Sequence, residues 1–350
     1  MTSRERIRIA MQHGIPDRVP VWCQLSVGHV ELAGFPAGSS ARSGEEFIEA
    51  QCALVKRYRF DGILVVGACL RRSKSPTGED TDCLNQGWDG EQQFSGAFAD
   101  CDPEHWSNAI PSYTADDFYG AQYARSIVGE ELHLGGWVPD AFSRACNWFN
   151  FNLSEAMMAL AEDPARFLAL VEWFRPKTIA LALAQAQLGG IESVHISSPY
   201  AGSGFISREM YQRFVLPGIM DLADALRPLG VFSYIHNCGC IHDRLELMAT
   251  SGVDGLECMD PPPLGDVRLS DAKARVGKQQ FLKGNLDSVN VLLFGDDELV
   301  EQTVQQCLLD GSAGGGYILS TACSVAPGVN PERMMRLVDY AERWGHYDHE

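Results

Sequence analysis

The sequence predicts an α/β fold, a single (β/α)8 TIM barrel in which parallel strands alternate with helices. Short apolar runs of strand length alternate with longer helical stretches, and eight such runs can be counted along the chain. No Gly-x-Gly-x-x-Gly follows the first run, which disfavours a doubly wound dinucleotide-binding sheet. The length of 350 residues suits one barrel with insertions. We therefore expect one domain over residues 1–350.

The expected elements follow from apolar runs and from helix start signals. The expected strands cover residues 19–23, 61–66, 132–138, 193–197, 231–235, 253–256, 280–283 and 316–319. The expected helices between them cover residues 44–59, 154–188, 207–228, 241–251, 267–276 and 296–310. Thr2 and Glu5 form a capping box for a first helix, and Asn330 with Pro331 is typical of the start of a last one.

Residues 71–130 interrupt the alternation of strands and helices. They are rich in Gly, Asp, Ser and Asn, and they carry scattered aromatic side chains such as Trp88 and Trp106. Connections of this length are usually functional lids or disordered segments, and the aromatic side chains favour an ordered one. We interpret the region as an elaborated connection after the second strand, with a hairpin near residues 87–96, and not as a separate domain.

Charge and composition exclude several kinds of partner. Lys and Arg total 28 against 46 Asp and Glu, which gives a formal net charge of −18. Nucleic acids and anionic membranes are bound through basic surface, so neither is expected as a partner. No apolar run approaches the ~20 residues that cross a bilayer, and the first residues lack the apolar core of a secretory signal. We expect a cytoplasmic protein whose 11 cysteines are reduced thiols.

Four residues of metal-ligating type stand at three expected strand ends. His236 and Cys238 follow the fifth strand and point to the same side, because residues i and i+2 of a strand do so. Glu257 ends the sixth strand, and Cys323 follows the eighth. One imidazole, two thiolates and a carboxylate form a tetrahedral zinc set. Since these ligands come from three strand ends, they predict a catalytic zinc in the mouth of a barrel.

Parts of this assignment have alternatives. A single Cys or His is more often a structural residue than a ligand. Cys240 and Cys258 are rival thiols near the proposed ligands, and Cys258 is the weaker rival because a shift of one residue reverses a side chain in a strand. Glu257 is either a resting ligand that substrate displaces or a hydrogen-bond partner of a ligand.

Four further residues are expected to bind substrate at the mouth of the barrel. Gln24 and His29 follow the first strand, Tyr200 follows the fourth and Asn285 follows the seventh. His29 can donate or accept a proton, and Asn285 can hydrogen-bond substrate. The alternatives are an ordinary loop histidine, a turn asparagine and a tyrosine that only packs.

A zinc ion held by two thiolates favours alkyl transfer. Such a zinc can hold a substrate thiol as its thiolate near neutral pH, which makes a nucleophile for attack on an alkyl group. It can equally bind an ether oxygen or a sulfur and so improve a leaving group. Both activities are steps of alkyl-transfer chemistry.

The chain resembles the uroporphyrinogen decarboxylase superfamily and, within it, the zinc-dependent methyltransferases. The resemblance covers nearly the whole chain and rests on five short motifs. They are Asp17-Arg18-Val19-Pro20-Val21-Trp22, Phe60-Asp61-Gly62-Ile63-Leu64, Phe205-Ile206-Ser207-Arg208-Glu209, Gly284-Asn285-Leu286-Asp287 and Pro331-Glu332-Arg333. The superfamily fold is a single α/β barrel, in agreement with the strand count. The His-x-Cys…Cys pattern resembles that of its thiol- and corrinoid-linked methyltransferases, and the spacing that includes Glu257 is similar to the zinc set of cobalamin-independent methionine synthase.

The chain departs from the decarboxylases where those enzymes bind and protonate their substrate. Leu25 and His29 stand where the decarboxylases have two arginines, and Ala68 stands where they have an essential aspartate. A barrel without these three residues is poorly suited to a polycarboxylated porphyrinogen. The resemblance therefore implies the methyltransferase branch.

For this branch the resemblance implies Zn2+ at the four predicted ligands and a corrinoid (cobalamin) carried by a partner protein. The methyl group would pass between that protein and a small methylated substrate, such as an aryl ether, amine or thioether, or a thiol. The chain has no Asp-x-His-x-x-Gly cobalamin motif, and we expect the corrinoid protein to dock over the top face that includes residues 71–130. Three alternatives stay open: a metal-independent decarboxylase using Asp61 and His29, a thiol alkyltransferase acting on an epoxide, and a non-catalytic scaffold.

Overall fold

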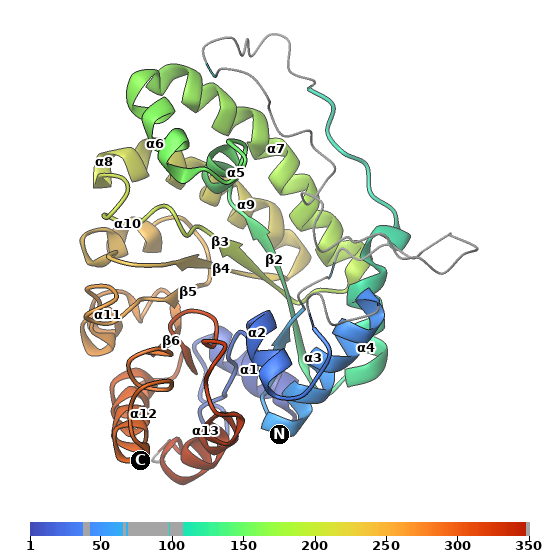
Figure 1. Cartoon of the computed structure of the whole chain (residues 1–350), viewed down its shortest axis with the longest axis vertical. Coiled ribbons are helices and arrows are strands. Elements are labelled where there is room, and N and C mark those ends of the chain that lie inside the picture. Colours follow the sequence, from blue (N-terminus) through green and yellow to red (C-terminus); the bar gives the residue numbers. More distant parts are fainter. Residues whose placement is uncertain (38–42, 66–67, 69–97, 99–107, 348–350) are drawn as a thin grey trace.

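Seven short parallel strands form one curled sheet in which they follow one another in chain order. They are β1 (Gly62–Leu64), β2 (His133–Pro139), β3 (Ser193–Ser197), β4 (Phe232–Asn237), β5 (Gly255–Cys258), β6 (Phe281–Leu286) and β7 (Tyr317–Thr321). Helices cover the outer side of this sheet (Figure 1), which confirms the predicted α/β fold of the TIM-barrel type. The computed structural model describes residues 1–37, 43–65, 68, 98 and 108–347.

Most helices lie where the sequence predicted them. They are α1 (Ser3–Met11), α2 (Val27–Leu32), α3 (Gly44–Tyr58), α4 (Tyr119–Val128), α5 (Ala141–Asn147), α6 (Leu153–Glu162), α7 (Pro164–Gly189), α8 (Arg208–Met210), α9 (Leu216–Leu226), α10 (Leu245–Ala249), α11 (Leu269–Val276), α12 (Asp297–Ser312) and α13 (Pro331–Trp344), with short turns η4 (Ala115–Phe118), η5 (Tyr211–Val215), η6 (Arg227–Leu229) and η7 (His242–Arg244). The capping box of Thr2 and Glu5 and the cap at Asn330 are confirmed. The single helix predicted over 154–188 is two, because Asp163 caps a new helix there.

The predicted first strand, residues 19–23, does not form a regular strand. Val21 pairs with Leu319 of β7 in a single bridge, and the N–H of Asp61, just before β1, donates to the Val21 carbonyl (2.8 Å). Pro20 has no N–H to add to a ladder, which limits regular pairing in this segment. The segment nevertheless lies between β7 and β1 and completes the barrel.

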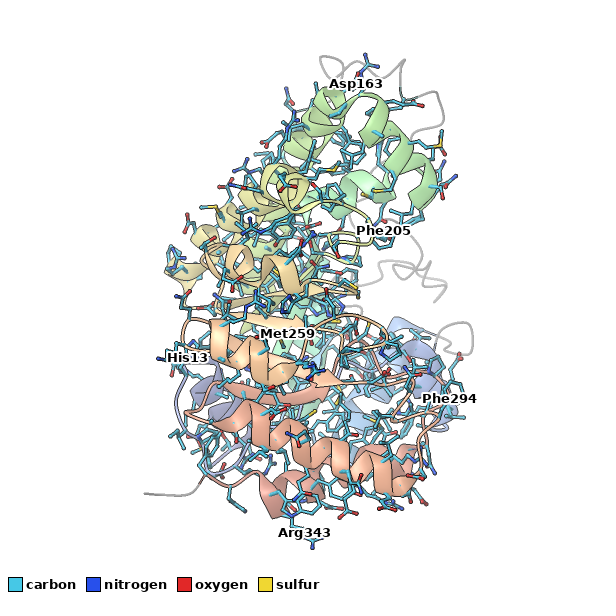
Figure 2. All side chains as sticks on the ribbon, turned by 90° about the vertical axis from the view of Figure 1, so that its left-hand side faces the viewer. His13, Asp163, Phe205, Met259, Phe294 and Arg343 are labelled. Atoms are coloured by element: carbon cyan, nitrogen blue, oxygen red, sulfur yellow. The ribbon has the colours of Figure 1, made fainter. Side chains whose placement is uncertain are left out.

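Helix α1 covers the amino-terminal end of the barrel. Its buried side chains form one cluster with residues of the barrel interior: Ile7, Ala10, Met11, Trp22, Leu64, Tyr234, Phe281 and Ile318. The interior is therefore a packed core, as is usual for this fold. In Figure 2, His13, which follows α1, lies on the opposite side of the molecule from Phe205 and Phe294, which lie in the connections after β3 and β6. The latter side is the one at which the strands end.

The long connection predicted over residues 71–130 is described only in part. The hairpin expected near residues 87–96 lies outside the described residues. Phe98 packs its ring against Phe149 and Phe167 at 5.2 and 6.3 Å between centroids, and α4 packs beside α3. Among the described residues, no helix has the length and apolar character needed to cross a membrane.

Candidate metal centre

Three of the predicted metal ligands converge at the carboxyl end of the barrel. His236 Nε2 lies 3.2 Å from Cys238 Sγ and 3.9 Å from Cys323 Sγ, and the two sulfur atoms are 3.9 Å apart. In a tetrahedral zinc site with bonds of about 2.0–2.3 Å, neighbouring N and S ligands are about 3.5–3.8 Å apart. The donor set therefore fits zinc with three protein ligands and a fourth position left for substrate.

The turn after β4 fixes the position of Cys238. The Nδ2 of Asn237 donates to the carbonyls of Ser198 (2.9 Å) and Cys238 (3.3 Å). Gly239 follows with a φ of +76°, a conformation that glycine adopts without a steric cost, and its N–H donates to Asp260 (2.7 Å). Cys238 is thus held on both sides by hydrogen bonds of its neighbours.

The loop after β7 fixes the position of Cys323. The N–H of Ala322 donates to the carbonyl of Leu286 in β6 (2.8 Å), and the N–H of Val325 donates to the carbonyl of Gln24 (2.8 Å). The segment that completes the barrel therefore also anchors the loop that carries the second thiol. Among the residues that the structure describes, the buried side-chain Oε1 of Gln24 has no hydrogen-bond partner.

Glu257 lies against the ring nitrogen of His236 that faces away from the thiols. Its Oε2 is 3.0 Å from His236 Nδ1, and it forms a close group with His236 and His195. A carboxylate at Nδ1 accepts the Nδ1–H and leaves Nε2 as the nitrogen that can bind metal. Of the two roles expected for Glu257, this geometry favours the one in which it holds a ligand.

Two side chains behind Glu257 were not predicted from the sequence. Lys283 Nζ contacts Glu257 Oε1, and His195 Nδ1 lies 3.2 Å from Glu257 Oε2. Strand register places Glu257 beside both His236 and Lys283, and Glu257 and Lys283 are only 2% and 1% exposed. Burial lowers the pKa of Lys283 to about 7, whereas the contact with a carboxylate favours its ammonium form. A lysine inside an apolar strand was the available sequence signal, because buried charges need partners.

The pKa values of the titratable groups in this cluster are shifted in opposite directions. Burial alone would lower the pKa of His236, but the thiols of Cys238 and Cys323 raise it to about 10. Hydrogen bonds with Cys238 and Cys258 hold the pKa of Cys323 far below its usual range. Burial lowers the pKa of His195 well below its usual value, so this ring is neutral. An imidazolium beside a thiolate is a site at which metal binding is coupled to proton release.

The rival thiols differ in their distance from the cluster. Cys258 Sγ lies within 4.8 Å of both Cys238 Sγ and a carboxylate oxygen of Asp260. Cys258 has a φ of +78°, so the simple alternation of a strand does not apply at this residue. Burial raises the pKa of its thiol well above the usual value. Within the described part of the chain, Cys240 belongs to none of the close groups of metal-ligating side chains.

Two of the predicted substrate-binding residues lie in structural contacts. His29 is fully buried in α2, and its Nε2 lies 2.8 Å from the Tyr58 hydroxyl of α3. Asn285 is also buried, and its Nδ2 donates to the carbonyls of Met259 (2.9 Å) and Val267 (3.3 Å). These contacts join α2 to α3 and β6 to the connection after β5. The substrate-binding role of both residues stays a prediction that this geometry does not favour.

Tyr200 lies nearer to the candidate ligands. Its hydroxyl donates to Asn147 Oδ1 (3.0 Å), and its ring meets that of Phe205 edge-on. Burial raises the pKa of Tyr200, with smaller contributions from Cys146 and Cys238. A half-buried phenol close to Cys238 is consistent with the predicted place of Tyr200 in a substrate pocket.

These features define a parallel α/β barrel with a cluster of metal-binding type at the carboxyl end of its strands. Residues 121–344 match the uroporphyrinogen decarboxylase (URO-D) family. The chain belongs to this family.

Relatives of the chain include both methyltransferases and decarboxylases. The methylcobamide:CoM methyltransferase MtbA of Methanosarcina mazei is 28% identical over 178 residues, which are 50% of this chain and 49% of that protein. The uroporphyrinogen decarboxylase of Streptomyces griseus is 31% identical over 194 residues, 55% of this chain and 49% of that protein. The chain thus spans about half the length of these curated relatives. A solved methyltransferase structure from Methanosarcina mazei has a TM-score of 0.74 at 17% identity, covering 98% of this chain and 99% of that chain, which supports the barrel fold.

Proposed function

We propose that this protein is a zinc-dependent methyltransferase that moves a methyl group between a small methylated substrate, or a thiol, and a separate corrinoid protein. The observation that carries this proposal is the cluster of His236, Cys238 and Cys323, whose separations suit three ligands of a zinc tetrahedron. Membership of a family with methyltransferase relatives supports it.

The residues of the cluster have distinct roles in this proposal. His236 Nε2 and the sulfur atoms of Cys238 and Cys323 would hold the zinc. When bound, zinc stabilises a substrate thiol as its thiolate or polarises the atom that carries the methyl group. Glu257 accepts the Nδ1–H of His236 (3.0 Å) and so keeps Nε2 directed at the two sulfur atoms.

The proposed corrinoid partner would dock on the side at which the strands end. Phe205 and Phe294 lie on this side (Figure 2) and are 49% and 75% exposed. Aromatic side chains are enriched at protein–protein interfaces relative to the rest of the surface. Because the chain carries no corrinoid motif of its own, the carrier has to arrive on a separate protein or domain.

The metal-independent decarboxylase is the second candidate, since a uroporphyrinogen decarboxylase is 31% identical to the chain over the matched part. It requires Asp61 and His29 to act together. Asp61 is bound by Arg6 and Arg18 before β1, at the amino-terminal end of the barrel, whereas His29 contacts Tyr58 between two outer helices. The two side chains therefore have separate sets of partners, which favours the methyltransferase.

A methyl-transfer assay tests the proposal. Zinc-loaded protein would be mixed with methylcobalamin, which stands in for the carrier, and a small thiol. We expect loss of methylcobalamin together with formation of the methyl thioether, and loss of this activity in Cys238→Ala. The control is Cys52→Ala, a buried thiol of α3. Zinc-loaded protein that transfers no methyl group between methylcobalamin and thiols, aryl ethers or amines in either direction would contradict the proposal.

A further inference from the structure

We infer that Lys283 is a positioning residue of the metal centre, which acts by holding the carboxylate of Glu257 in place against His236. This inference rests on the proposed function, because it concerns the same zinc site. Lys283 does not itself contact a proposed ligand atom. It belongs instead to a row of three buried side chains that runs from β6 through β5 to β4.

The strand register creates this row. Glu257 pairs with Lys283 on one side and with His236 on the other, so all three side chains point into the barrel at one level. One carboxylate oxygen of Glu257 contacts Lys283 Nζ, and the other lies 3.0 Å from His236 Nδ1. Lys283 and His236 thus contact different oxygens of the same carboxylate. Movement of Lys283 would therefore shift the oxygen that accepts the Nδ1–H of His236.

Aromatic rings hold the Lys283 ammonium on the side away from the metal ligands. Lys283 Nζ lies 4.6 Å from the ring centre of Trp22 and 5.8 Å from that of Tyr234. Both rings are fully buried. Ring faces attract a cation, and desolvated contacts of this kind are the stronger ones. The rings therefore exclude water from the ammonium and leave the carboxylate as its charged partner.

The balance of charge explains why the position needs a lysine. Two thiolates neutralise a divalent zinc ion, so the carboxylate of Glu257 adds a buried negative charge. The ammonium form of Lys283 balances that charge, whereas the neutral ring of His195 does not. Without Lys283, Glu257 Oε1 would lose its charged partner, and the carboxylate could turn away from the Nδ1–H of His236. The imidazole would then be a less basic and less well-oriented ligand.

Zinc affinity, measured by competition with a chromophoric chelator at fixed pH, tests the inference in a double-mutant cycle. We expect Lys283→Met to bind zinc about 10–100-fold more weakly than wild type, the usual effect of losing a partner of a ligand. In the Glu257→Gln background the same substitution should change the affinity by no more than about twofold, because the carboxylate through which Lys283 acts has already been removed. The matched control is Lys177→Met, a buried lysine of α7 whose Nζ lies 3.5 Å from the ring centre of Trp173. It should bind zinc as wild type does.

The outcomes separate this inference from the proposed function. Wild-type affinity in Lys283→Met, or an equal loss in the wild-type and Glu257→Gln backgrounds, would overturn the inference and leave the zinc site standing. A wild-type protein that binds no zinc would overturn the proposed function itself. If Lys283→Met does not fold, the inference is tested by comparing the zinc affinities of Glu257→Gln/Lys283→Met and Glu257→Gln. The double variant is expected to fold because it leaves no buried charge unpaired. A tenfold difference between these two would refute the role assigned to Lys283.

Discussion

Replacing Asp61 by asparagine separates a structural role of this residue from a chemical one. Its buried carboxylate accepts hydrogen bonds from Arg6 Nη1 (2.5 Å), Arg18 Nη1 (2.9 Å) and the Val21 N–H (2.8 Å). Removing one partner of a buried ion pair costs about 3–5 kcal/mol. Because Arg6 keeps Asp17 as a second partner (2.6 Å), the cost comes mainly from Arg18, and we expect a loss of stability near the lower end, about 3 kcal/mol.

Urea unfolding followed by circular dichroism measures this loss as a lower midpoint with an unchanged slope. The folded Asp61→Asn variant should bind zinc and transfer methyl groups as wild type does, because Asp61 lies at the end of the barrel away from the metal centre. The control is Asp339→Asn, which removes an exposed ion pair with Arg59 and should cost less than about 1 kcal/mol. A variant with wild-type stability but without activity would refute this reasoning and assign Asp61 to the chemistry.

Two further predictions follow from the predicted substrate-binding residues. Asn285→Ala removes the hydrogen bonds to the carbonyls of Met259 and Val267. It should therefore lower the free energy of unfolding by about 1–3 kcal/mol and leave KM unchanged. A raised KM at wild-type stability would show that Asn285 binds substrate. Burial lowers the pKa of both His29 and His133 from 6.5 to about 4. As the pH falls from about 6.5 to 4 the unfolded chain takes up these protons first, so stability should fall over this range and level off below it. In His29→Gln, unfolding should take up one proton fewer over this range, so the urea midpoint should depend less steeply on pH. An unchanged pH dependence would contradict the buried, neutral state of His29.

The convergence of the candidate ligands could be predicted from the sequence, because all strands of a parallel barrel end on the same face. Any His or Cys that follows an apolar run is then brought near the others, whatever the sequence distance between them. This argument placed His236, Cys238 and Cys323 together. It needed only the ends of the strands, which the apolar runs predicted to within a few residues.

The side chains around the ligands could not be predicted, because they depend on how neighbouring strands are aligned. The positions of Glu257 beside His236 and of Lys283 beside Glu257 follow from the register of β4, β5 and β6, and the near-continuous apolar runs of strands that are buried on both faces do not fix this register. The positive φ at Cys258 likewise breaks the alternation on which its side-chain direction was predicted. The prediction of a regular strand over residues 19–23 was wrong because pairing there is reduced to one isolated bridge, between Val21 and Leu319.

The central claim is that His236, Cys238 and Cys323 bind one zinc ion, and metal analysis of purified protein tests it most directly. The protein should be prepared without chelators and with its thiols kept reduced, as wild type, as Cys323→Ala and as Cys307→Ala, a buried thiol of α12. We predict about one zinc per chain in wild type and in Cys307→Ala, since a three-ligand site holds a single ion, and little or none in Cys323→Ala. Wild-type protein without zinc, or zinc that Cys323→Ala retains in full, would contradict the account.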